Sequence, residues 1–358
     1  MKPKRMVIFL LMLASIGACA LPGLQAFWQI FRPQPEAALD RAMRVKTIET
    51  LVTKLNDHYV FPDKAKKIGA VLQQRLQEGK YDGIGDGYKL AQQLTADVRG
   101  VARDVHMEVR FAPKMVLPDE AEGPAPASRV EWEQRNNVVT RLIMRYTATR
   151  GTVRVGLLGA NIGYLRISGF PDAFLMTDKF AAAMDELADT DGLIVDLRRN
   201  RGGDPQSVAL LVSYFVDQRT RLNDLWDRDT GKTIQHWTED KLDGKRYGGR
   251  KPVLLLVGPE TASAGEDFAY TMQALKRATV LGERTWGGAH PASPHRIGGH
   301  FYAVIPSQRS ISPITGTNWE GVGVTPDVVV APEDALAAAR KLMQRRTRGI
   351  APLVAAGH

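Results

Sequence analysis

The chain has 358 residues, of which 44% are hydrophobic and 24% charged, and its formal net charge is +9. A core of ordinary size is available, in two domains or in one large domain with an appendage. The positive charge does not form a basic patch interleaved with aromatic residues, so nucleic-acid binding is not expected, and the charge is interpreted as solvated surface suited to an anionic membrane. Cys19 is the only cysteine, which excludes an intrachain disulfide and a cysteine-based metal site.

The first residues have the pattern of an export signal. A basic start, residues 1–5, precedes an apolar run, Met6–Ile16, that is too short for a comfortable transmembrane helix. Residues 1–18 are therefore predicted to be a signal peptide, and the proline-containing residues 19–36 a tether.

The end of this signal, Ile16-Gly17-Ala18-Cys19, resembles a bacterial lipoprotein cleavage box. The resemblance implies that Cys19 becomes the lipidated first residue. In such lipoproteins an aspartate after the cysteine signals retention at the inner membrane. Ala20 stands at that position, which implies sorting to the periplasmic face of the outer membrane in a Gram-negative bacterium. Cleavage after Ala20 or after Ala26, which would leave a periplasmic or secreted protein, and an uncleaved anchor are the alternatives.

Residues 37–111 are predicted to form a small, mainly helical domain. Three apolar faces with helical spacing run through Ala38–Leu55, Ile68–Leu76 and Leu90–Val98. From Val105 onward apolar and polar residues alternate, which predicts a strand with His106 on its polar side. Residues 112–150 contain four prolines and are predicted to be a linker, with no room for an inserted peptide-binding domain of about 90 residues.

From Thr152 the pattern becomes α/β. Strands are predicted at Val153–Leu157, Ile162–Ile167 and Leu193–Leu197, with an amphipathic helix at Ala173–Leu187. The turn 198–203 ends in two glycines, which allow a close approach of backbone N–H groups, and neither a G-x-G-x-x-G nor a Walker lysine supports a phosphate loop. We predict an α/β (α+β) protein with a second domain at 151–345 and a frayed tail at 346–358; the polar stretch 223–250 is expected to be a surface excursion.

Ser263 lies where a buried strand, Val253–Val257, gives way to a helix whose apolar face begins at Phe268. Backbone N–H groups at a helix start are unpaired and carry partial positive charge, so a serine hydroxyl there can attack a carbonyl whose oxyanion meets those donors. The same spacing, Ser263-x-x-Glu266, is also a capping box, and taken alone this stretch favours a structural cap, because capping boxes far outnumber nucleophiles.

Three histidines, His290, His295 and His300, are evenly spaced in a glycine-rich segment. Because no carboxylate is interleaved with them and the segment is a loop, we expect no metal site there.

Several stretches together resemble the C-terminal-processing (tail-specific) serine peptidase family, in the branch related to interphotoreceptor retinoid-binding protein and the tricorn protease core. The resemblance extends from about residue 48 to 330. Each stretch alone is weak evidence, but their order along the chain is specific to the family. The stretches are His58-Tyr-Val-Phe-Pro, Asp104-Val-His106, Asn161-Ile-Gly-Tyr-Leu, Asp191-Gly-Leu-Ile-Val-Asp-Leu-Arg198, Arg201-Gly-Gly, Thr261-Ala-Ser263-Ala, Gly287-Gly-Ala-His290-Pro and Thr315-Gly-Thr-Asn-Trp-Glu320-Gly-Val-Gly-Val.

The resemblance implies a ClpP/crotonase-like catalytic domain that needs neither cofactor nor metal and acts on peptides or unfolded proteins. It implies that Ser263 is the nucleophile, His106 the general base and Glu320 the carboxylate that orients the histidine. It also implies an oxyanion hole made by the N–H group of Ala264 and a glycine amide from Gly202-Gly203.

Two departures from the family pattern stand out. The lysine that serves as base in members with a PDZ domain is replaced by Gly288, which excludes a Ser–Lys dyad. An Asp-Lys-His-Leu motif reads Asp104-Val-His106-Met, which keeps the histidine. Glu266 is interpreted as structural.

Two functions remain open at this point. The first is an exported serine peptidase that forms an acyl-enzyme on Ser263. The second is a non-catalytic binding or scaffold protein of the same fold, which carries an apolar ligand or a peptide. The complete Ser/His/Glu set favours the peptidase, because a binder needs none of the three.

Overall fold

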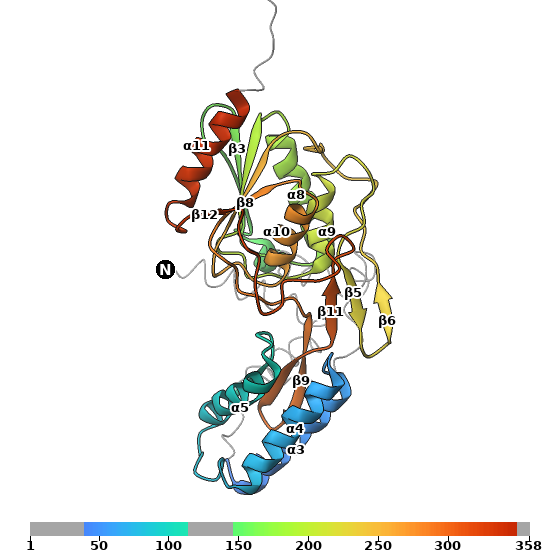
Figure 1. The fold of residues 1–358 in the computed structure, drawn as a ribbon, viewed down its shortest axis with the longest axis vertical. Helices are drawn as coiled ribbons and strands as arrows, with labels where there is room; N and C mark the ends of the chain where they lie inside the picture. The colour runs from blue at the N-terminus through green and yellow to red at the C-terminus, as the bar shows by residue number, and fades with distance from the viewer. Residues whose placement is uncertain (1–38, 114–145, 349–358) are drawn as a thin grey trace, which may run out of the picture.

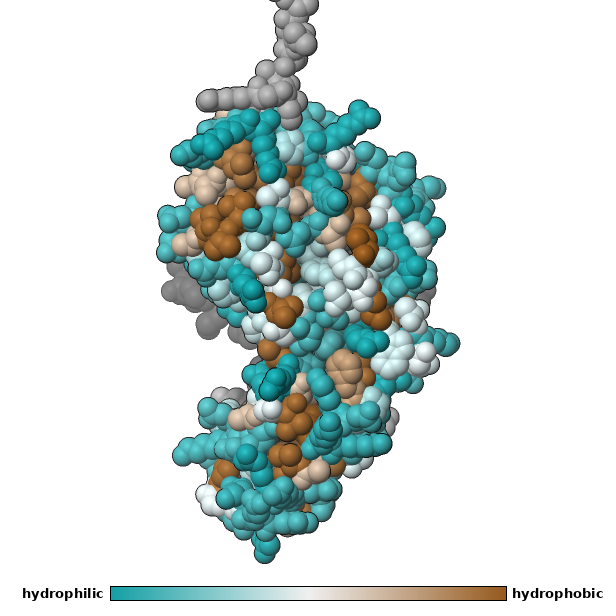
Figure 2. Space-filling view, in the orientation of Figure 1, coloured by the Kyte–Doolittle hydropathy of each residue, from teal (hydrophilic) through white to brown (hydrophobic). Residues whose placement is uncertain are grey.

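A computed structural model describes residues 39–113 and 146–348. The chain forms two bodies joined by a narrow waist (Figures 1 and 2). The visible surface is mostly hydrophilic, with small separate apolar areas (Figure 2). The predicted signal peptide, Cys19, the tether, most of the linker and the last ten residues lie outside the described ranges. No helix within those ranges has the length and apolar character needed to cross a bilayer.

The smaller body begins with three helices, α3 (Arg41–His58), α4 (Pro62–Gln77) and α5 (Gly87–Ala102). Aspartate side chains cap two of them: Asp40 accepts the N–H of Met43 at 2.7 Å, and Asp86 accepts the N–H of Lys89 at 2.8 Å. The buried faces of the helices meet in one core. The predicted helical region is therefore present.

A three-stranded antiparallel sheet completes this body, in the order β1 (Glu108–Phe111), β10 (Phe301–Pro306) and β9 (Ala292–Gly298). Ile297, Phe301 and Ile305 are buried in the same core as the three helices. The predicted boundary at residue 111 implied a contiguous domain. The small body is instead discontinuous, because it includes a hairpin from nearly 200 positions further on.

The strand predicted from Val105 is shorter than expected and begins at Glu108. Asp104 Oδ1 accepts the backbone N–H of His106 at 3.1 Å, which holds residues 105–106 in a turn. His106 therefore lies in the turn between α5 and β1 and not on the strand.

The larger body is built on a six-stranded sheet, in the order β12-β8-β7-β4-β3-β2. All neighbours are parallel except the β2–β3 pair. The strands are β2 (Val153–Leu157), β3 (Ile162–Ile167), β4 (Gly192–Asp196), β7 (Val253–Val257), β8 (Thr279–Gly282) and β12 (Val328–Val329). This sheet confirms the predicted α/β class.

Helices cover both faces of this sheet (Figure 1). One face packs on α8 (Ala173–Leu187), α9 (Pro205–Ser213) and α10 (Ala264–Ala274), and the other on α11 (Ala335–Arg348). Alternate residues of one strand serve the two faces: Leu193 and Val195 join the first core, while Ile194 joins the second. Burial on both faces explains why β4 and β7 read as continuous apolar runs.

A small sheet lies near the waist, in the order β11 (Gln308–Ile311), β5 (Asp224–Asp227) and β6 (Lys232–Ile234) (Figure 1). The stretch expected to be a surface excursion thus contains a hairpin. Beside this hairpin, the guanidinium of Arg228 donates to the carbonyls of Asn56 and Tyr59 in the smaller body. These bonds fasten the two bodies together.

Candidate active site

Ser263 occupies the turn between β7 and α10 in a strained conformation. Its φ is +52° and its ψ is −120°, a combination that non-glycine residues rarely adopt. Gly202 packs against it, since a Cβ at that position would lie 2.7 Å from Ser263 Cβ and 3.0 Å from the nitrogen of Ala264. Backbone strain of this kind is concentrated at functional sites, where the surrounding structure enforces it.

Glu266 holds the Ser263 turn in place through hydrogen bonds. Its side chain is buried and accepts four hydrogen bonds: from the N–H groups of Ser263 at 2.9 Å, Gly287 at 2.6 Å and Gly288 at 2.9 Å, and from the hydroxyl of Thr285 at 2.5 Å. Burial raises the pKa of Glu266, and the four donors oppose that rise. The carboxylate ties the Ser263 turn to the 285–288 turn, so it does more than complete a capping box.

His106 and Ser263, although 157 positions apart in the chain (263 − 106), line the same cavity of about 210 Å³. Both also line an adjoining open groove. Ser263 comes from the larger body and His106 from the smaller one. The structure thus brings together two of the residues that the sequence singled out.

The His106 ring lies in a close-fitting niche. The Trp286 ring lies nearly perpendicular to it, with the ring centroids 4.8 Å apart. A Cβ on residue 288 would approach the Cε1 atom of His106 to 2.5 Å. A lysine at this position, as in the members with a PDZ domain, would therefore clash with the His106 ring. Burial lowers the pKa of His106 to about 4, although the charge of Asp104 opposes this shift. The imidazole is therefore neutral at pH 7 and able to accept a proton.

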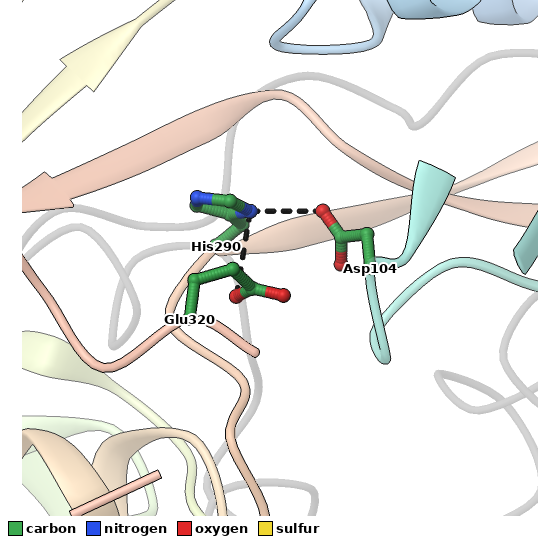
Figure 3. Close-up of side chains that lie close together, drawn as sticks. All are labelled: Asp104, His290 and Glu320. Carbon is green, nitrogen blue, oxygen red and sulfur yellow. Dashed lines mark hydrogen bonds and ion pairs between the residues drawn. The ribbon is translucent and has the colours of Figure 1, made fainter. Parts of the chain in front are cut away.

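Glu320 lies beside His290, and within the described residues no hydrogen bond or ion pair joins it to His106, the histidine that the resemblance assigns to it. Its Oε2 accepts the N–H of Ala289 at 2.6 Å and lies 3.4 Å from His290 Nδ1, while that nitrogen lies 2.8 Å from Asp104 Oδ2 (Figure 3). Burial, with the charge of Asp104 next in importance, raises the pKa of Glu320 to about 7.

Two buried atoms at this place have no hydrogen-bond partner among the residues that the structure describes. They are Nδ1 of His106 and Oε1 of Glu320. An unpaired buried polar atom costs about 1–3 kcal/mol, so such atoms call for an explanation.

The sequence reasoning missed the pairing of His290 with Asp104. Both residues belong to motifs that the sequence displays, but His290 was grouped with His295 and His300. The three histidines separate in the fold: the His295 ring stacks on that of His58, with centroids 4.2 Å apart, and the His300 ring lies perpendicular to that of Phe111, with centroids 6.1 Å apart. Only His290 enters the candidate site.

Asp104, His290 and Glu320 could together offer ligands to a metal ion, because their donor atoms lie within 4.8 Å of one another. The 2.8 Å separation of His290 Nδ1 and Asp104 Oδ2 is that of a hydrogen bond. Two donors of one tetrahedral zinc ion would lie about 3.3 Å apart. The geometry therefore fits a hydrogen-bonded cluster better than a metal site.

The predicted oxyanion donors differ in availability. The N–H of Gly202 is engaged by Asn200 Oδ1 at 2.9 Å. No acceptor for the N–H groups of Gly203 and Ala264 is found in the part of the chain that the structure covers, and both residues line the cavity with Ser263. This is the geometry of a serine-hydrolase site: one cavity contains a strained serine at a strand-to-helix turn, free N–H groups beside that serine, and a neutral histidine.

Comparison with known proteins places the chain within a family. The model of peptidase family S41 matches residues 161–330, and the model of the N-terminal domain of peptidase S41 in eukaryotic IRBP matches residues 37–146. The chain belongs to peptidase family S41, which confirms the resemblance seen in the sequence.

The relatives are distant. The tricorn protease of Thermoplasma volcanium is 30% identical over 173 residues, 47% of this chain and 15% of that protein. The carboxy-terminal-processing protease of Bartonella bacilliformis is 28% identical over 182 residues, 48% of this chain and 39% of that protein. This chain thus spans well under half the length of either curated relative. The structure of mature CPAF shares the fold with a TM-score of 0.57 at 12% identity, over 88% of this chain and 99% of that one.

Proposed function

We propose that this protein is an exported serine peptidase that cleaves short or unfolded polypeptides through an acyl-enzyme on Ser263. The observation that carries the proposal is the strained Ser263 in one cavity with His106. A binding protein gains nothing from a serine held at a cost of about 1–3 kcal/mol in a rare backbone conformation.

The proposed reaction uses this chain's own groups. Neutral His106 takes the hydroxyl proton as Ser263 Oγ attacks the peptide carbonyl carbon. The oxyanion that forms meets the free N–H groups of Gly203 and Ala264, while Gly202 supplies the close packing that places them. His106 then protonates the leaving amine. Water, activated by the same imidazole, hydrolyses the acyl-enzyme and restores Ser263.

Glu320 is proposed to stabilise the imidazolium that forms on His106. No hydrogen bond joins the two in this structure, because Nδ1 of His106 and Oε1 of Glu320 are both buried without a partner in the described ranges; the proposal is that they pair when His106 takes up the proton. The Ala289 N–H and His290 hold the other oxygen of Glu320, and Asp104 in turn holds His290. Asp104 and His290 would thus act as positioning residues.

The pH dependence should report on Glu320. Its pKa is raised to about 7, so the carboxyl is protonated below that pH and cannot accept from an imidazolium. We expect kcat/KM to rise with pH through about 7. Glu320→Gln should lower kcat/KM by about 10²–10⁴-fold and remove this step, leaving the titration of His106 at about pH 4. An unchanged pH profile in Glu320→Gln would show that Glu320 is not coupled to the reaction.

Export and lipidation at Cys19 are supported by the amino-terminal sequence pattern alone. With lipidation, Cys19→Ser should move the protein from the membrane fraction to the soluble fraction in a Gram-negative host and abolish incorporation of labelled palmitate. Recovery of palmitate-free wild-type protein from the periplasm would favour ordinary signal cleavage.

The proposed activity is tested by incubating the purified protein with an unfolded protein substrate such as reduced, alkylated casein and with a fluorophosphonate probe. Cleavage and labelling that share a dependence on Ser263 are expected. A folded protein that neither cleaves nor labels would favour the binding-module alternative.

A further inference from the structure

Asp267 lies one helical turn beyond Ser263 on α10 and lines the same cavity of about 210 Å³. Residues four apart on a helix lie on the same face, so the Asp267 carboxylate and Ser263 both face this cavity. The mechanism proposed above makes no use of this aspartate.

The carboxylate of Asp267 has no cationic partner in the structure's described ranges. Its Oδ1 accepts from the side-chain amide of Asn223 at 2.6 Å and from the hydroxyl of Thr271 at 3.3 Å. Its Oδ2 has no hydrogen bond within those ranges, and Asp267 is one of the residues that line the cavity. Burial raises the pKa of Asp267 to about 6, which is the mark of a carboxylate short of compensating charge.

The remaining cavity wall suits a long side chain with a charged end. Pro205, Val304 and Trp319 supply apolar surface, and no lysine or arginine is among the residues that line the cavity. The methylenes of a lysine or arginine side chain can pack on such walls while the charged head reaches a carboxylate. The cavity also contains Gly203 and Ala264, the proposed oxyanion donors, so a side chain entering it belongs to the residue whose carbonyl is attacked.

We propose that this cavity receives the substrate side chain on the amino side of the cleaved bond, and that Asp267 selects lysine or arginine there. The inference rests on the proposed peptidase function, because it assigns a substrate class to the same site. The competing explanation is that Asp267 only ties α10 to Asn223, through the bond that its Oδ1 accepts, and does not meet substrate.

The first test uses wild-type protein and two fluorogenic peptides, identical except for arginine or citrulline before the cleaved bond. Citrulline has nearly the shape of arginine without its charge. We expect kcat/KM to be at least about tenfold higher for arginine, as for a desolvated charge pair. Equal values in a protein that labels with the fluorophosphonate probe would overturn the inference and leave the peptidase function intact. Failure of both cleavage and labelling would overturn the peptidase function, and this inference with it.

The second test compares Asp267→Asn with a matched change on the surface, Asp82→Asn, since Asp82 is exposed in the smaller body. In Asp267→Asn the arginine-to-citrulline ratio should fall to about one, chiefly because arginine cleavage slows. In Asp82→Asn the ratio should stay at its wild-type value. A folded Asp267→Asn protein that keeps the wild-type ratio would show that Asp267 has a structural role only. Should Asp267→Asn not fold, the wild-type comparison decides alone.

Discussion

Ser263→Ala is expected to abolish covalent labelling by a fluorophosphonate probe and to lower peptide hydrolysis by about 10⁴–10⁶-fold, since removal of a nucleophile leaves only the oxyanion donors and substrate binding. The alanine side chain removes one oxygen atom, so packing against Gly202 is retained. Labelling is measured by gel fluorescence and hydrolysis by release of peptides from casein.

Ser293→Ala is the matched control, because Ser293 is an exposed serine on β9. It should label and cleave as wild type does. Persistent labelling of Ser263→Ala would place the nucleophile elsewhere. A folded wild-type protein that never labels would instead support a carrier of apolar ligands or peptides.

Glu266→Ala is expected to reduce the free energy of unfolding by about 3–5 kcal/mol, because it strips a buried acceptor from four donors at once. The loss should also relax the Ser263 turn, so that labelling by the fluorophosphonate probe slows even where the protein remains folded. Urea unfolding followed by tryptophan fluorescence, together with labelling rates measured well below the unfolding midpoint, checks both parts.

Asp86→Ala provides the comparison, since Asp86 caps α5 through a single bond to the N–H of Lys89. Loss of that cap should cost about 1 kcal/mol and leave labelling unchanged. If Glu266→Ala cost no more than Asp86→Ala, the carboxylate would be an ordinary helix cap and its link to the 285–288 turn would carry little energy.

Local signals were sufficient for much of this fold. The apolar run of β7 and the helical spacing of α10 place Ser263 at a strand-to-helix turn, and the same two signals predict β4 and α8. Each of these features is determined by near neighbours along the chain, which is the information that periodicity contains.

Long-range pairing was beyond these signals. The partner of β1 is β10, nearly 200 positions later, and the partner of Asp104 is His290, 186 positions away. The alternation within one strand does not indicate which strand pairs with it, so the sequence predicts residues 37–111 as one contiguous, mainly helical domain that ends in the His106 strand. His106 was assigned to a strand because the turn that holds it depends on one side-chain bond from Asp104.

The hairpin that completes the smaller body affects how the protein is made. Synthesis proceeds from the amino terminus, and the three helices emerge long before residues 292–306 exist to cover their apolar faces. The turn with His106 precedes β1, whose one strand partner among the described residues, β10, lies some 40 residues beyond Ser263. A partly synthesised chain therefore contains the serine before the imidazole has its fixed place. On the proposed mechanism, a chain that ends before β10 lacks the strand that pairs with β1 and is expected to have no peptidase activity.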